Sequence, residues 1–130
     1  MQPTKMADNE LQPKVMAVSW KEDFCILLDQ TKLPGQELYL VCRRYEEIIE
    51  AIKRLAVRGA PALGVAGAYG CALAVGQTLE QPEKNRSSFL NKAFSDLENA
   101  RPTAVNLKWA IDRMRRNVHN EEISSRIHRR

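Results

Sequence analysis

Aromatic residues make up only 6% of the 130-residue sequence, and neither sign of charge dominates it. The net charge of +4 suits an anionic ligand but gives no support for a nucleic-acid partner. No CxxC pair is present, so Cys25, Cys42 and Cys71 are expected to be buried, free thiols of a reducing compartment. His119 and His128 lack metal-ligand spacing, so no metal site is expected. The N-terminal 13 residues contain no apolar run, which argues against a secretory signal.

Charged residues are also absent between Arg58 and Glu80, where over half of the residues are Gly or Ala. This run is long enough to cross a membrane, but its composition is weakly hydrophobic. We therefore predict a buried core helix and no membrane partner. Each interior Gly costs a helix about 1 kcal/mol relative to Ala. Close approach of another backbone or of a ligand would offset that cost, and tight helix packing is the favoured explanation for Gly64, Gly67 and Gly70.

The remaining pattern predicts an α+β domain in which a small three-stranded antiparallel sheet precedes about four helices. Three β-rich runs, at residues 15–20, 24–28 and 38–42, predict the strands, and the first two form a hairpin. Apolar residues at helical spacing predict a helix that starts at Tyr45 and is ended by Gly59.

Proline positions predict the later helix starts, because proline is tolerated in the first turn. Pro61 opens the charge-free helix, which runs to about Leu79, and Pro102 opens the fourth helix. Between them, a third helix places Phe89, Leu90, Ala93, Phe94 and Leu97 on its inner face. After Val118 the apolar pattern fades. The expected organisation is a flexible tail over residues 1–12, a domain over 13–118 and a divergent tail over 119–130.

Two arginines stand just before helix starts, Arg58 ahead of Pro61 and Arg101 ahead of Pro102. A helix start attracts anions because it presents unpaired N–H groups and a partial positive charge. A nearby guanidinium can add bidentate hydrogen bonds to a phosphate, and Gly59 lets a ligand approach the backbone closely. The pattern predicts a small phosphorylated ligand between two helix starts. The alternative is that each arginine is a solvated or salt-bridged loop residue.

Three stretches, at residues 27–34, 57–64 and 100–107, resemble the N-terminal part of the methylthioribose-1-phosphate isomerase family. The family is related to ribose-1,5-bisphosphate isomerase and to the regulatory subunits of translation initiation factor 2B, and the resemblance covers about residues 15–118. It implies a metal-free aldose–ketose isomerase of methionine salvage, and so of methionine biosynthesis, that needs no cofactor. The reaction would convert S-methyl-5-thio-α-D-ribose 1-phosphate into the ribulose phosphate. A cytoplasmic homodimer is expected, with the nucleus as an additional location.

The resemblance also assigns roles to residues. The family's substrate contacts match Arg58, Gly59, Ala60 and Arg101, whereas its catalytic cysteine and aspartate belong to a Rossmann-like C-terminal domain that this sequence lacks. The resemblance therefore implies a truncated isoform, partial product or fragment that holds no catalytic residue and is inactive alone. Two alternatives are open. One is a non-catalytic interaction module that binds a copy of itself or a related subunit. The other is a chain that folds poorly without a partner for its small-residue helix.

Overall fold

The computed structural model of the chain describes the backbone of residues 4–7 and 17–128 and the side chains of residues 17–118. Three strands, β2 (Val18–Lys21), β3 (Phe24–Leu28) and β4 (Leu38–Cys42), form an antiparallel sheet in which Cys25 lies opposite Cys42. These strands and the helices that follow confirm the predicted α+β class.

The sheet has one strand more than predicted. Strand β1 (Thr4–Ala7) pairs antiparallel with β4, giving the order β1-β4-β3-β2. This finding corrects the prediction of a flexible tail for residues 4–7, while residues 1–3 and 8–12 lie outside the described residues. The strand was missed because backbone pairing with a segment more than 30 residues away holds it in the sheet, and no local apolar alternation announces it.

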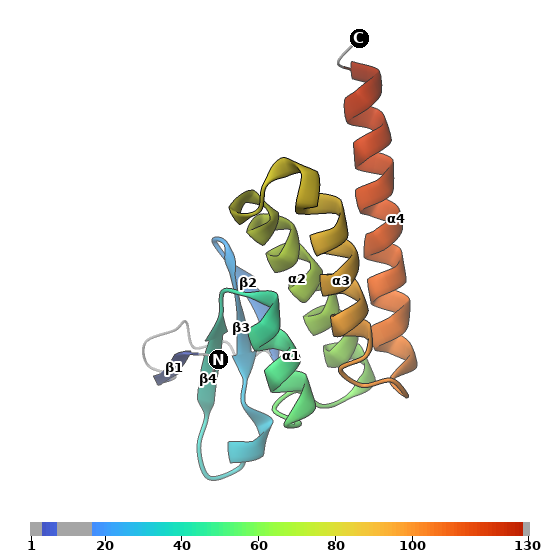
Figure 1. Cartoon of the computed structure of the whole chain (residues 1–130). Helices are drawn as coiled ribbons and strands as arrows, with labels where there is room; N and C mark the ends of the chain where they lie inside the picture. Colours follow the sequence, from blue (N-terminus) through green and yellow to red (C-terminus); the bar gives the residue numbers. More distant parts are fainter. Residues whose placement is uncertain (1–3, 8–16, 129–130) are drawn as a thin grey trace.

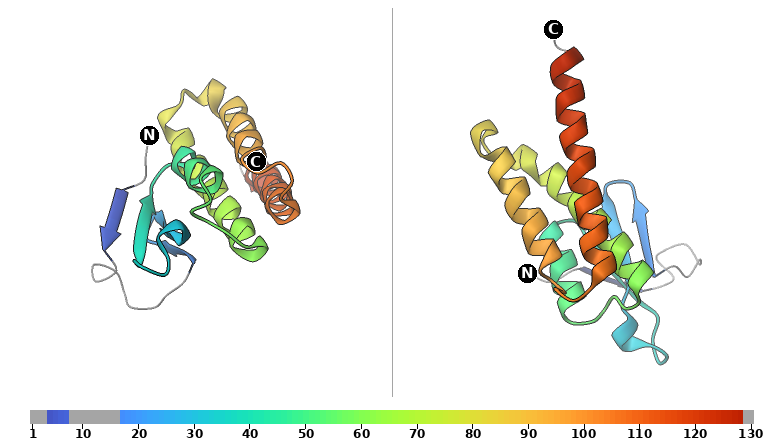
Figure 2. Two further views of the ribbon diagram at one scale, coloured as in Figure 1. Left: turned by 90° about the horizontal axis from the view of Figure 1, so that it is seen from below. Right: turned by 90° about the vertical axis from the view of Figure 1, so that its right-hand side faces the viewer.

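Four α-helices follow the sheet: α1 (Tyr45–Lys53), α2 (Ala60–Gln77), α3 (Arg86–Glu98) and α4 (Val105–His128). Short 3-10 turns lie at Gln30–Lys32, Thr78–Glu80 and Glu83–Asn85. Figure 1 shows the sheet beside α1, and α4 projecting beyond the other helices. Seen from below in Figure 2, the sheet, the pair α1 and α2, and the pair α3 and α4 form successive layers. Helix α2 is therefore the central element, in contact with the sheet and with every other α-helix.

The glycines of α2 face these neighbours at very short distance. A Cβ atom added to Gly67 would lie 2.5 Å from Leu107 Cδ1 of α4, and one added to Gly70 would lie 2.7 Å from Leu97 Cδ2 of α3. Tight helix packing, the favoured explanation, is thus confirmed at these two positions. By length and composition alone Ala60–Glu80 is apolar enough to cross a membrane, but half of its most apolar stretch is buried inside the fold.

Three helix boundaries differ from the predictions. Helix α1 ends at Lys53 rather than at Gly59, because Leu55 adopts a left-handed backbone with φ 65°. The N–H of Ala56 then donates to the Ala51 carbonyl at 2.9 Å, and that of Leu55 to the Ile52 carbonyl at 3.2 Å. This pair of bonds is a Schellman motif, for which glycine is the usual sequence signal. Leucine in that position gave no signal, so the end was missed.

The fourth helix also starts and ends later than predicted. Pro102 lies in a turn, and α4 begins at Val105. At the other end the helix continues through His128, so the expected tail over 119–130 is helical as far as that residue.

Candidate functional site

An open pocket of about 540 Å³ lies where the chain enters α2 and α4. All four residues matched to substrate contacts line this pocket. Arg58 and Gly59 lie in the loop between α1 and α2, Ala60 is the first residue of α2, and Arg101 lies in the turn between α3 and α4. The other lining residues are Leu55, Leu63, Thr103, Ala104, Val105 and Asn106. Because it lies between the two arginines, we call it the anion pocket.

Both helix starts present backbone donors toward this region. In α2 the first intrahelical bond runs from the Leu63 N–H to the Gly59 carbonyl at 3.0 Å, and in α4 it runs from the Lys108 N–H to the Ala104 carbonyl at 3.2 Å. The N–H groups before these bonds have no acceptor within the helix. Gly59, with φ 91°, sits at the N-cap of α2 in a conformation that side-chain-bearing residues rarely adopt.

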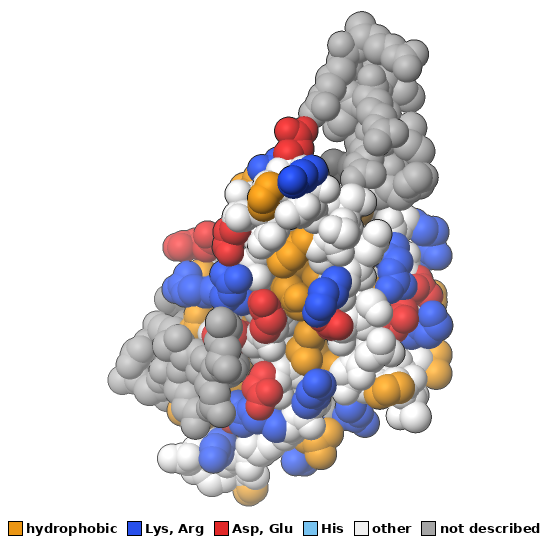
Figure 3. All heavy atoms as spheres, viewed as in Figure 1, with side chains coloured by type: hydrophobic (Ala, Val, Ile, Leu, Met, Phe, Trp, Pro, Cys, Tyr) orange, Lys and Arg blue, Asp and Glu red, His pale blue; other side chains and the backbone are white. Residues whose placement is uncertain are grey.

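The two arginines of the pocket keep their charge uncompensated. The Arg58 Nε donates to the Leu55 carbonyl at 3.2 Å, and among residues 17–118 neither Arg58 nor Arg101 forms an ion pair. The described part of the pocket wall contains no acidic residue. The salt-bridged alternative is therefore wrong within the described residues, whereas the solvated alternative stays open, and two guanidinium groups without an ion pair line the pocket. Figure 3 shows Lys and Arg side chains spread over one face of the molecule, among Asp and Glu side chains.

A buried carboxylate supports the loop that carries Arg58. Asp29 is fully buried, and its Oδ1 accepts hydrogen bonds from the Thr31 N–H at 3.0 Å and from the Thr31 hydroxyl. Asp29 thus bonds its own loop. Its Oδ2 also forms an ion pair with Arg54 Nη1 at 3.2 Å. Burial raises the pKa of Asp29, but the Thr31 hydrogen bonds and the Arg54 charge outweigh it and hold the pKa below its usual value.

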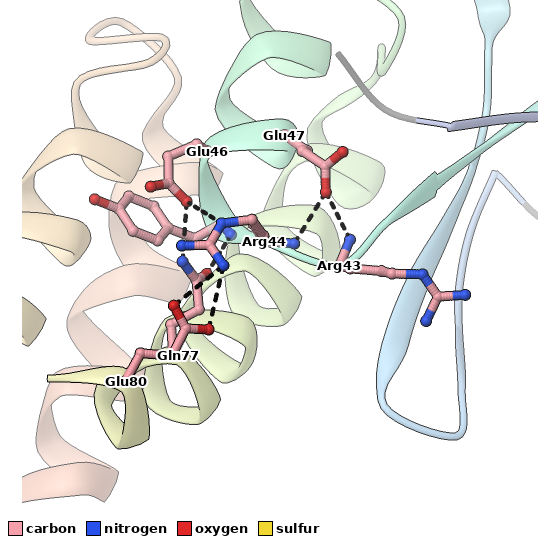
Figure 4. A network of polar contacts seen from close by, with 7 residues as sticks. Arg43, Arg44, Glu46, Glu47, Gln77 and Glu80 are labelled. Carbon is pink, nitrogen blue, oxygen red and sulfur yellow. Dashed lines mark hydrogen bonds and ion pairs between the residues drawn. The ribbon is translucent and has the colours of Figure 1, made fainter. Parts of the chain in front are cut away.

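A second polar network joins the opposite ends of α1 and α2 (Figure 4). Glu47 Oε1 accepts from the backbone N–H groups of Arg43 at 2.9 Å and Arg44 at 3.1 Å. Arg44 Nη1 donates to both Glu80 oxygens at 3.2 Å. Buried Gln77 accepts from the Tyr45 N–H at 2.7 Å. These bonds fix the start of α1 to the end of α2.

An apolar groove of about 410 Å³ runs along α2 and α4 beside the anion pocket. Trp109 is 59% exposed and Val65 is 43% exposed on its walls, and the Arg113 guanidinium lies 5.4 Å from the centre of the Trp109 ring. Asn106 lines both hollows. The other groove residues are Pro61, Gly64, Ala68, Tyr69, Ala110, Met114 and Asn117.

The described wall of the anion pocket holds no group for acid–base or covalent chemistry. The anion pocket is lined there by no thiol, carboxylate or imidazole. Cys25, Cys42 and Cys71 are fully buried as predicted, and burial raises the pKa of Cys25 and of Cys71 to about 12. No group of three possible metal ligands occurs among the described residues. The side chains of His119 and His128 lie outside them.

Comparison with known proteins places these features in a family. The model of the initiation factor 2 subunit family matches residues 56–129, a region that includes most of the segment expected to diverge. A methylthioribose-1-phosphate isomerase of Aquifex aeolicus is 52% identical over 95 residues, covering 73% of this chain and 19% of that protein.

Two solved structures share the fold. The 5-methylthioribose 1-phosphate isomerase of Pyrococcus horikoshii matches with a TM-score of 0.76 and 34% identity, over 88% of this chain and 32% of its own. The delta subunit of translation initiation factor 2B from A. fulgidus matches with a TM-score of 0.70 and 46% identity, over 77% of this chain and 29% of its own. The chain thus spans less than a third of the length of these relatives.

Proposed function

The chain belongs to the initiation factor 2 subunit family, and on this premise we propose that it is the substrate-binding domain of a methylthioribose-1-phosphate isomerase. Arg58 and Arg101 hold the phosphate of the sugar, and the backbone at Gly59 and Ala60 closes on it. The isomerisation belongs to methionine salvage and takes place in the cytoplasm, in a homodimer.

One observation carries this proposal: the anion pocket brings Arg58 and Arg101 together at two helix starts. Guanidinium groups match phosphate geometry bidentately, and free helix N–H groups add donors that favour a negative ligand. A volume of about 540 Å³ is within the range of small-molecule sites. A sugar phosphate is also the kind of ligand that the names of the isomerase relatives print.

The residues that line this pocket favour binding of the substrate without its isomerisation. Conversion of an aldose to a ketose moves a proton or a hydride between C1 and C2, which requires positioned acid–base or nucleophilic groups. The described pocket wall offers two guanidinium groups, an alcohol and an amide instead. We therefore infer that the chain alone holds the substrate and does not turn it over.

Calorimetry of the 130-residue chain tests this function. Methylthioribose 1-phosphate should bind at one site, and unphosphorylated methylthioribose should bind at least tenfold more weakly because the arginines lose their partner. The same samples should form no ribulose phosphate. Equal binding of the two sugars, or no binding of either, would refute the phosphate-binding role. Measurable isomerisation would refute the inferred inactivity.

The apolar groove favours a second candidate, a non-catalytic module that binds a copy of itself or a related subunit. Trp109 and Val65 expose apolar surface there, and the fold is shared with an initiation factor 2B subunit. Light scattering that shows a defined complex, together with no calorimetric binding of phosphate esters, would favour this candidate over the sugar-phosphate domain.

A further inference from the structure

Segment 54–59 forms one wall of the anion pocket, and it contains a residue with an unfavourable backbone conformation. Leu55, with φ 65°, is in the left-handed region, which is unfavourable for a residue with a side chain. Leu55 is also 43% exposed and lines the pocket. The carbonyl of Leu55 accepts the hydrogen bond from Arg58 Nε. The orientation of the Arg58 side chain therefore depends on the shape of this turn.

The turn at residues 29–31 fastens segment 54–59 on both sides of Leu55. Before it, Arg54 Nη1 lies 3.2 Å from Asp29 Oδ2. After it, the Ala56 carbonyl accepts a hydrogen bond from the Gln30 N–H at 2.9 Å. The side chain of Asp29 is itself fixed by two hydrogen bonds from Thr31. A fully buried carboxylate thus connects the end of β3 with the loop that presents Arg58.

We propose that Asp29 is a positioning residue for the anion pocket: through Thr31 and Arg54 it fixes segment 54–59, and so sets Arg58 and Gly59 for a phosphate. The proposal rests on the proposed function, since it concerns the affinity of the same pocket. Neither the helix starts nor the pocket lining indicates this role for Asp29.

The sign of one substitution separates positioning from simple electrostatics. Asp29→Asn removes a negative charge near an anion site, so charge alone predicts equal or tighter phosphate binding. Positioning predicts the opposite, because Arg54 loses its ionic partner and the turn around Leu55 loosens. We expect the dissociation constant for methylthioribose 1-phosphate, measured by calorimetry, to rise about tenfold. In an Arg58→Ala background, the same substitution should have a smaller effect, because Arg58 is one of the two residues through which Asp29 acts.

Two further variants keep the test decisive. Thr31→Val changes an exposed residue, removes the hydroxyl donor to Asp29 without changing charge, and should weaken binding severalfold even if Asp29→Asn does not fold. Glu47→Gln is the matched control. It neutralises another buried carboxylate that accepts backbone N–H bonds, but at the opposite end of α1. It should lower stability while leaving affinity within about twofold.

Circular dichroism and urea unfolding establish that each variant is folded at the temperature of titration. If the unmodified chain binds and both folded variants, at positions 29 and 31, bind equally well, positioning is overturned and the proposed function survives. If Glu47→Gln weakens binding as much as Asp29→Asn, the effect is general destabilisation and positioning is again overturned. If the unmodified chain does not bind, the proposed function fails and the positioning role fails with it.

Discussion

At the scale of residues, two arginine side chains supply the charge of the anion pocket. Arg58 and Arg101 both line it, and neither makes an ion pair within the described residues. By contrast, Arg54 and Arg115, which also belong to the described residues, form ion pairs with carboxylates. Uncompensated guanidinium groups near free helix N–H donors form a site whose binding energy depends on the two side chains.

Replacing either pocket arginine by alanine should weaken binding of methylthioribose 1-phosphate about tenfold to a hundredfold, the usual contribution of hydrogen bonds to a charged group. Isothermal calorimetry at fixed salt measures the change. Arg113→Ala is the matched control: it removes the same charge from the apolar groove and should leave the affinity nearly unchanged, because solvent and salt screen exposed charges. An equal loss in all three variants would indicate attraction to net charge rather than to this pocket.

The sequence predicted the arginines of the pocket but not the residues that support them. Arg58, Gly59 and Pro61 lie within a few positions of one another, so their pattern can be recognised in the sequence. The ion pair of Asp29 with Arg54 joins residues 25 positions apart, and only the folded chain brings them together. The left-handed Leu55 was equally hidden, since its sequence context predicts continued helix.

At the scale of elements, α2 is shaped by what packs against it. Its interior glycines allow Leu107 of α4 and Leu97 of α3 to approach the helix backbone. Gly76, near the end of the same helix, is exposed and would place a Cβ atom in open space. Close packing therefore offsets the free-energy cost of a helical glycine at Gly67 and Gly70, but not at Gly76.

Alanine substitution should affect the free energy of unfolding differently at Gly67 and at Gly76. Gly76→Ala should raise the free energy of unfolding by about 0.5–1 kcal/mol through helix propensity alone. Gly67→Ala should leave the protein about 1–3 kcal/mol less stable than Gly76→Ala, because its Cβ atom would overlap fully buried Leu107. Urea unfolding measures both values. Equal stability of the two variants would contradict the role assigned to helix packing.

Element types followed from the sequence more readily than element ends. The β-rich runs predicted three strands, and apolar spacing together with proline positions predicted four helices, because the apolar residues in both patterns are buried against the same core. The helix ends depended on features that composition does not reveal. Pro102 is compatible with a turn as well as with a first helical position. In the structure it lies in a turn.

At the scale of the whole molecule, polar residues at the two ends of α1 and α2 have different roles. At one end, hydrogen bonds of Glu47, Gln77 and the Arg44–Glu80 pair join the start of α1 to the preceding loop and to the end of α2. At the other end, the chain enters α2 and α4 and leaves two arginines facing a pocket. This arrangement yields a domain that can hold an anionic ligand at one end.

The central claim is that a sugar phosphate binds between the starts of α2 and α4. The most direct measurement is a titration of the chain, 14.8 kDa and so suited to amide NMR, with methylthioribose 1-phosphate. The predicted result is that saturable shifts concentrate on the backbone amides of residues 58–60 and 103–106. Shifts centred instead on the apolar groove around Val65 and Trp109, or no saturable shifts at millimolar ligand, would contradict it.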